Sequence, residues 1–165
     1  MFIRYRRRVG IVVVAALLCL HFGVMPAWAW TGKVVKIQDG DSFKVRKGAK
    51  IYGVRLYGID CPEFDQEYGM AAKQRLAAMI PPGTRVVIDV VDVDSYGRVV
   101  ALVSSGSRLV NAELVRSGAA WVTPRYCRQK SVCRDFRRLE QEARKQRRGL
   151  WRSEHPEPPW RWRRR

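Results

Sequence analysis

The stretch VRLYGIDCPE, residues 54–63, shows most clearly how this chain of 165 residues is organised. Arg55 alternates with apolar neighbours, as in a β-strand with one buried face, and this alternation predicts a strand over residues 51–59. Asp60 and Glu63 follow directly after the strand. Because loops at strand ends often carry functional side chains, the stretch predicts both a core strand and a candidate site.

The residues before this strand predict two more strands. Residues 32–38 alternate, and Asp39-Gly40 is typical of a two-residue hairpin turn with left-handed backbone angles. The alternation then resumes at Phe43 and Val45, and Gly48 marks the next turn. With residues 51–59, these segments predict a three-stranded meander.

The residues after the site stretch predict helices and a second group of strands. Helices are expected over residues 69–80, over residues 111–117 and from Val132 to Gly149, and strands over residues 85–93 and 98–103. Five short strands in two groups, with a helix between them, favour a mainly β fold with α-helices. The expected architecture is a five-stranded OB-fold barrel with three helices.

The first 29 residues have the pattern of a secretory signal peptide. Four arginines precede an apolar run over residues 9–25, and Ala27 and Ala29 supply small residues at the positions that a signal peptidase reads. We expect cleavage after Ala29, and therefore an exported protein that is periplasmic or secreted. The alternative is a retained membrane anchor, because the run approaches the ~20 residues that span a bilayer.

Positive charge is concentrated towards the C-terminus. The net charge is +17, and residues 125–165 contain 15 Lys and Arg against five Asp and Glu. Such a surface attracts polyphosphate chains, anionic lipids or acidic proteins, although a merely solvated basic tail would have the same composition. A domain over residues 30–152 is expected, followed by a disordered tail over residues 153–165. The Trp and Arg residues of that tail could add weak contacts with bases or with an anionic membrane.

Three cysteines remain after the expected cleavage. Cys127 and Cys133 lie six positions apart in a chain expected to meet oxidising conditions, which predicts a disulfide. Cys61 is left over and is expected to be a buried small residue. His155 is then the sole histidine, which argues against a zinc site.

Three polar segments fall at strand ends or turns: residues 39–43, residues 54–63 and residues 94–98. Each has a plain structural explanation when taken alone, as a hairpin turn, as solvated loop carboxylates or as a polar turn. Asp41 fits that explanation least well, because a carboxylate at the start of a strand has no role in the turn.

Taken together, the segments resemble the staphylococcal-type nuclease (thermonuclease) family, which has an SNase-like OB-fold domain. The resemblance extends from about Lys33 to Trp151 and rests on five motifs in the same order and at matching spacing. They are the D-G-D-[ST] hairpin, the R-L-x-x-[IV]-D-x-P-E strand end, the D-x-Y-G-R turn, the N-x-x-L-V-R-x-G helix and a closing G-L-W.

The resemblance implies a role for eight residues of this sequence. It assigns calcium binding to Asp41, Asp60 and the main-chain carbonyl of Cys61, catalysis to Arg55, Glu63 and Arg98, and nucleotide contact to Tyr96 and Tyr126. Glu63 is the implied general base, and the two arginines are the implied phosphate ligands. Carboxylate and carbonyl oxygens suit one Ca²⁺ or Mg²⁺ ion better than zinc. Ser95 and Pro124 depart from residues of some family members, which affects the expected substrate preference and not the reaction type.

The leading hypothesis is therefore a calcium-dependent endonuclease that hydrolyses DNA or RNA with little sequence specificity. It would act as a monomer with one Ca²⁺ ion and no obligate protein partner. The main alternative is a catalytically inactive nucleic-acid-binding OB-fold protein, since one fold supports both. A third hypothesis is a cationic protein that binds the cell envelope through its Trp/Arg tail.

Overall fold

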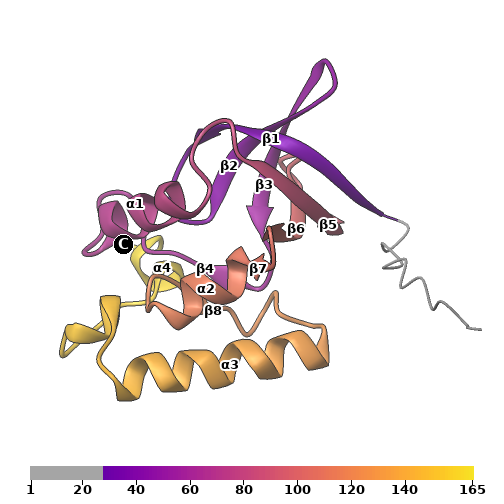
Figure 1. The fold of residues 1–165 in the computed structure, drawn as a ribbon. Helices are drawn as coiled ribbons and strands as arrows, with labels where there is room; N and C mark the ends of the chain where they lie inside the picture. The colour runs from indigo at the N-terminus through magenta and orange to yellow at the C-terminus, as the bar shows by residue number, and fades with distance from the viewer. Residues whose placement is uncertain (1–27) are drawn as a thin grey trace, which may run out of the picture.

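Five strands close into a barrel in the computed structural model, which describes residues 28–165 (Figure 1). The barrel strands are β1 (Ala29–Ile37), β2 (Ser42–Lys47), β3 (Lys50–Leu56), β5 (Arg85–Val93) and β6 (Val99–Ser105). They follow the order β3-β2-β1-β5-β6, and a parallel pairing of β3 with β6 closes the ring. Two short pairings lie outside the barrel: β7 (Arg108–Leu109) pairs with β6, and β4 (Ile59–Asp60) pairs with β8 (Trp121–Val122). The predicted OB-fold barrel is confirmed.

Two irregularities bend the strands enough to close the barrel. The register between β1 and β2 shifts between Val34 and Lys36, so that Val35 forms a bulge. A second shift interrupts the pairing of β5 with β6 between Val90 and Asp92. Bulges of this kind increase strand twist and turn the corners of small barrels. The bulge also changes the phase of β1, so that Val34 and Ile37 are buried.

The predicted third strand ends earlier than its sequence pattern indicates. A turn at Tyr57-Gly58 separates β3 from β4, and Gly58 has a left-handed φ of +75°. The chain leaves the barrel at this turn, and β4 pairs instead with β8. Asp60 therefore lies on a short strand below the barrel and not on the barrel itself.

The predicted two-residue turn at Asp39-Gly40 is wrong in its details. Gly40 does not have a left-handed φ. A Cβ on Gly40 would lie 2.7 Å from the Cβ of Cys61, so glycine is needed there for a close approach. Asp39 stabilises the turn through its side chain, whose Oδ1 accepts a hydrogen bond from the Asp41 N–H at 3.0 Å. The turn thus brings Asp41 against the chain that carries Asp60.

The helices cover one side and the lower end of the barrel in Figure 1. They are α1 (Gly69–Met79), α2 (Val110–Arg116), α3 (Lys130–Lys145), the 3-10 helix η1 (Gly149–Arg152) and the short α4 (Pro159–Trp162). The three predicted helices are present, although the third ends at Lys145, before Gly149. Helix α3 buries one face against the core, and its other face is polar, which fits the predicted spacing; the buried residues are Cys133, Phe136, Leu139 and Ala143.

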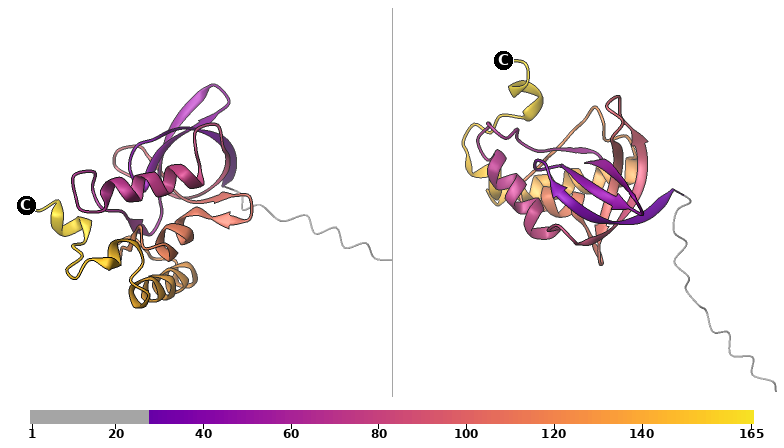
Figure 2. Two further views of the ribbon diagram at one scale, coloured as in Figure 1. Left: turned by 60° about the vertical axis from the view of Figure 1, so that its left-hand side comes forward. Right: turned by 90° about the horizontal axis from the view of Figure 1, so that it is seen from above.

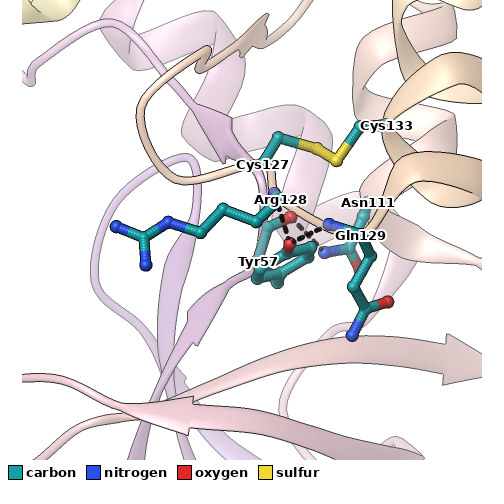
Figure 3. Close-up of a disulfide and its surroundings, with 6 residues drawn as sticks. All are labelled: Tyr57, Asn111, Cys127, Arg128, Gln129 and Cys133. Carbon is teal, nitrogen blue, oxygen red and sulfur yellow. Dashed lines mark hydrogen bonds between the residues drawn. A yellow bond between two sulfur atoms is a disulfide. The ribbon is translucent and has the colours of Figure 1, made fainter.

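Asn111 joins the barrel to the helices through a fully satisfied amide (Figure 3). Its side-chain NH₂ donates to the carbonyl oxygens of Tyr57 and Ala101 at 3.0 and 3.2 Å, and its Oδ1 accepts from the Val103 N–H at 3.0 Å. Asn111 is completely buried. The asparagine of the helix motif is therefore a structural residue that fixes the turn before β4.

A disulfide between Cys127 and Cys133 fixes the segment that leads into α3 (Figure 3). The hydroxyl of Tyr57 accepts hydrogen bonds from the backbone N–H groups of Arg128 and Gln129, at 2.7 and 2.9 Å. The predicted disulfide is present. Together these contacts attach the segment after β8 to the same Tyr57 turn that Asn111 holds.

The C-terminal tail follows a defined course along the domain, where its composition favoured disorder (Figure 2). The ring of Trp160 packs edge-on against Trp121, with centroids 5.7 Å apart. The Trp162 indole N–H donates to Asp65 at 3.2 Å. The contacts of Trp160 and Trp162 therefore hold the tail, residues 153–165, against the domain despite its many charged residues.

The predicted export segment lies almost entirely outside the described residues, which begin at Trp28. Within residues 28–165, none of the helices combines the length and the apolar character needed to cross a membrane.

Candidate active site

Two buried aspartates share one arginine at the lower end of the barrel. Arg55 donates from Nη1 to Oδ1 of Asp41 at 2.5 Å and from Nη2 to Oδ1 of Asp60 at 2.7 Å. Asp41 is 3% exposed and Asp60 is 4% exposed. Such charge-assisted, two-armed pairing is strong and geometrically specific. The first and second segments singled out in the sequence therefore meet at a single guanidinium group.

Strand register explains why Asp41 and Arg55 meet. Ser42 at the start of β2 pairs with Arg55 on β3, and the Leu56 N–H donates to the Asp41 carbonyl oxygen at 2.9 Å. The Cys61 N–H donates to Oδ2 of Asp41 at 2.9 Å. Asp41 is thus attached to the start of β2, to β3 and to the chain after β4, so its position depends on the closure of the barrel.

Asp41 and Asp60 are two acids buried close together, and the pKa values of both are raised. Burial raises the pKa of Asp41; the guanidinium of Arg55 opposes this effect and the nearby carboxylate of Asp39 adds to it. Burial also raises the pKa of Asp60, and the charge of Asp41 raises it further, while Arg163 and Arg55 lower it. Burial alone would lower the pKa of Arg55, but the two aspartates raise it above its ordinary value. The site therefore needs cations to keep both acids ionised.

Arg98 lies on the same side of the barrel as Arg55. The parallel register pairs Val54 with Val99, which places Arg98 beside Gly53. A Cβ on Gly53 would lie 3.3 Å from Cγ of Arg98, so the stem of Arg98 crosses β3 at this glycine. Gly53 and Arg55 are two residues apart and point to the same face of the strand. The two arginines are therefore neighbours on one face.

The D-x-Y-G-R turn orients the Arg98 side chain. Asp94 accepts from Nε of Arg98 at 2.7 Å and from the Arg98 N–H at 2.9 Å. Burial alone would raise the pKa of Asp94, but these hydrogen bonds, that of the Tyr96 N–H and the charge of Arg98 together lower it. The terminal nitrogens of Arg98 make no hydrogen bond within the described residues. They are available to an anion.

Glu63 is connected to the aspartate pair through Arg163, a residue that the sequence patterns did not identify. Arg163 donates from Nη2 to Oδ2 of Asp60 at 2.5 Å and from Nη1 to Oε1 of Glu63 at 2.5 Å. Arg55 from β3 and Arg163 from the C-terminal tail thus both bond to Asp60. No sequence signal distinguishes Arg163 from the three other arginines of the tail, because its contacts span 100 residues or more.

The three remaining predicted residues differ in their surroundings. Tyr96 is 84% exposed, and its ring lies 5.5 Å from the Arg98 guanidinium carbon. Tyr126 is exposed beside the disulfide, with Arg125 over its ring. Cys61 is buried, and burial raises the pKa of its thiol well above the usual range. Tyr96 thus lies beside Arg98, and the backbone N–H of Cys61 bonds to Asp41, while the metal-binding role of the Cys61 carbonyl oxygen stays a prediction.

The acids fit a hard divalent cation with few protein ligands. Within residues 28–165, His, Cys, Asp and Glu side chains form no group of three or more that could hold a metal ion. Asp41 and Asp60 nevertheless present buried carboxylate oxygens that repel each other and already share the charge of Arg55. Carboxylate oxygens are typical ligands of Ca²⁺ and Mg²⁺. A cation bound by these two residues would leave coordination positions for water and a phosphate oxygen.

Known proteins resemble the chain across this site. The family described as staphylococcal nuclease homologue matches residues 53–153. A protein named micrococcal nuclease from Shigella flexneri is 37% identical, with 92% of this chain and 90% of the relative covered. An uncharacterized endonuclease from Escherichia coli is also 37% identical, over 81% of this chain and 85% of the relative. Protein ParB from Escherichia coli is 38% identical over 96% of this chain and 94% of its own.

The family model includes Arg55, Asp60, Glu63 and Arg98 and begins after Asp41, whereas the matches to the micrococcal nuclease and to ParB cover 92% and 96% of the chain. The chain belongs to the staphylococcal nuclease family.

Proposed function

We propose that the protein is an exported, calcium-dependent endonuclease that hydrolyses phosphodiester bonds of DNA and RNA with little sequence specificity. The observation that carries the proposal is the cluster in which Arg55 joins Asp41 to Asp60. The family and the nuclease relatives support the reaction class. Export rests on the N-terminal signal pattern.

Asp41 and Asp60 are the residues that would hold the cation. When bound, a divalent cation supplies charge neutralisation of the phosphate and a position for the attacking water. Arg55 and Arg98 would bind the phosphate oxygens, because both side chains lie on one face of β3 and the terminal nitrogens of Arg98 make no hydrogen bond within residues 28–165. Guanidinium groups stabilise the negative charge that gathers as the phosphorus is attacked.

Glu63 would act as the general base. It would accept the proton of the water as the new P–O bond forms and the P–O bond to the leaving oxygen breaks. Its side chain is 36% exposed and held next to Asp60 by Arg163. The contacts proposed for substrate go to phosphate and not to base edges, so cleavage should depend little on sequence. Tyr96 and Tyr126 are exposed aromatic rings suited to stack on bases.

A cleavage assay with a matched pair of variants tests the proposal. Circular and linear DNA, and single-stranded RNA, are incubated with the protein lacking residues 1–29, with calcium or with a chelator. Glu63→Gln should lower the rate by about 10²–10⁴-fold, as expected for loss of a general base. Glu67→Gln makes the same chemical change on the same exposed loop and should retain the rate. Binding without cleavage in calcium, magnesium and manganese would instead support the inactive nucleic-acid-binding barrel.

A further inference from the structure

The C-terminal tail places the guanidinium group of Arg163 on two acids, Asp60 and Glu63, that the proposed reaction needs. Arg163 bonds to Oδ2 of Asp60 and to Oε1 of Glu63, both at 2.5 Å. In the proposed function, Asp60 would bind a divalent cation and Glu63 would bind water. A guanidinium group on both carboxylates excludes these partners while it stays bound.

The contacts of the tail are specific, and they converge on the loop that follows Glu63. The Gln66 side chain donates to the Glu157 carbonyl oxygen at 2.5 Å, and Trp162 donates to Asp65 at 3.2 Å. Trp160 packs on Trp121. Burial alone would lower the pKa of Arg163, but Asp60 and Glu63 raise it above its ordinary value. The tail is therefore attached at several points and delivers Arg163 to one place.

The same contacts are weak enough to be displaced. The Arg163 side chain is 45% exposed, against 22% for Arg55, which holds the same aspartate from the barrel side. A cavity of about 360 Å³ remains between the tail and the loop, lined in part by Pro62, Tyr68 and Trp162. A contact that is half exposed and incompletely packed costs little to open.

We propose that residues 153–165 form an autoinhibitory arm, in which Arg163 competes with the divalent cation for Asp60 and with water for Glu63. The proposal rests on the proposed function, since it requires that these acids bind a cation. In the closed state Arg163 covers Asp60 and Glu63; in the open state Glu63 is released and Asp60 keeps only Arg55. A polyphosphate chain would favour opening, because it offers alternative partners to Arg163 and to the other arginines of the arm.

Calcium binding measured by titration calorimetry tests the competition without relying on activity. If the arm is closed nine-tenths of the time, it weakens the apparent calcium affinity about tenfold. Arg163→Gln and deletion of residues 153–165 should therefore each tighten calcium binding by about tenfold. Arg161→Gln is the matched control: it removes the same charge two positions earlier, within α4, and within residues 28–165 the Arg161 side chain bonds to none of the acids. Its calcium affinity should equal that of the unchanged protein.

Hydrogen exchange provides a second readout on the unchanged protein. Saturating calcium should accelerate exchange at the Arg163 amide, which donates to the Pro159 carbonyl oxygen in the closed arm. Equal calcium affinities for the unchanged protein and Arg163→Gln, with cleavage intact, would overturn the arm proposal and leave the proposed function standing. Absence of both calcium binding and cleavage in the tail-deleted protein would overturn the two together.

Discussion

Replacing Arg55 with methionine should destabilise the fold far more than replacing Arg98. Arg55 is the partner of two carboxylates that are 3% and 4% exposed. Removing one partner of a buried ion pair typically costs about 3–5 kcal/mol, because a charge is left uncompensated. We expect a loss of about 3 kcal/mol, at the lower end of that range. Asp60 keeps Arg163, and Asp41 keeps the Ser42 hydroxyl and the Cys61 N–H.

Urea unfolding at pH 7 without calcium measures this loss. For a slope of about 1–3 kcal/mol per molar urea, the midpoint should fall by about 1–3 M. Arg98→Met is the control, since Arg98 is 31% exposed and pairs with an aspartate that is 19% exposed. A partly exposed pair of this kind contributes about 1 kcal/mol. Equal effects of the two substitutions would refute the reasoning.

The stability that Arg55→Met loses relative to the unchanged protein, called the deficit below, should depend on pH. This pH dependence tests whether uncompensated charge causes the loss. Burial raises the pKa of Asp41 above its value in the unfolded chain, so the folded protein binds a proton more readily. Stability contributed by that proton rises as pH falls through the folded-state pKa. The charge of Arg55 lowers the pKa of Asp41, so the Arg55→Met variant has a still higher pKa there and gains more stability on acidification than the unchanged protein. The deficit should therefore shrink when the pH is lowered from 7 to 5. A deficit that does not change on acidification would show that lost packing, and not uncompensated charge, causes the instability.

Three further predictions concern the residues that position the site. Asn111→Ala should lower the free energy of unfolding by about 2–4 kcal/mol in urea titrations, because it leaves the buried Val103 N–H and the Tyr57 carbonyl oxygen without this partner, while the Ala101 carbonyl oxygen keeps the Tyr57 N–H; a loss below 1 kcal/mol would contradict this role. Replacing both Cys127 and Cys133 with serine should cost about 2 kcal/mol, the value for a short closed loop, and an unchanged melting temperature would argue against the disulfide. Gly53→Ala should slow cleavage about tenfold at nearly unchanged stability, since the new Cβ displaces Arg98 by a few tenths of an ångström and misplacement by 1 Å can cost ~10²-fold; an unchanged rate would mean that Arg98 tolerates the shift.

Local patterns were sufficient to predict most of the barrel. Alternation and turn residues place β5 at Arg85–Val93 as observed, and β2 and β6 within a few residues. The patterns failed where tertiary contact decides the backbone. The break at Tyr57-Gly58 depends on the pairing of β4 with β8, and the bulge at Val35 depends on barrel closure. The partner of β4 is far away in the sequence, and the bulge, although it lies between the consecutive strands β1 and β2, serves a barrel whose other strands come later in the chain.

The sequence motifs identify most residues of the candidate site, but they do not predict which side chains contact one another. The motifs identify Asp41, Arg55 and Asp60, but their meeting follows from the register of β2 on β3 and from the turn before β4. Arg163 could not be predicted, because a basic, proline-rich tail has the composition of a disordered segment. Its position depends on aromatic packing against Trp121, which no local pattern reveals.

A crystal structure of the Glu63→Gln protein with calcium and a short DNA strand would test the central claim most directly. The account predicts one calcium ion bound by Asp41 and Asp60, a phosphate contacted by Arg55 and Arg98, and Arg163 withdrawn from the acids. DNA bound at a distance from these residues, with Arg55 still joining the two aspartates and no calcium between them, would contradict the account.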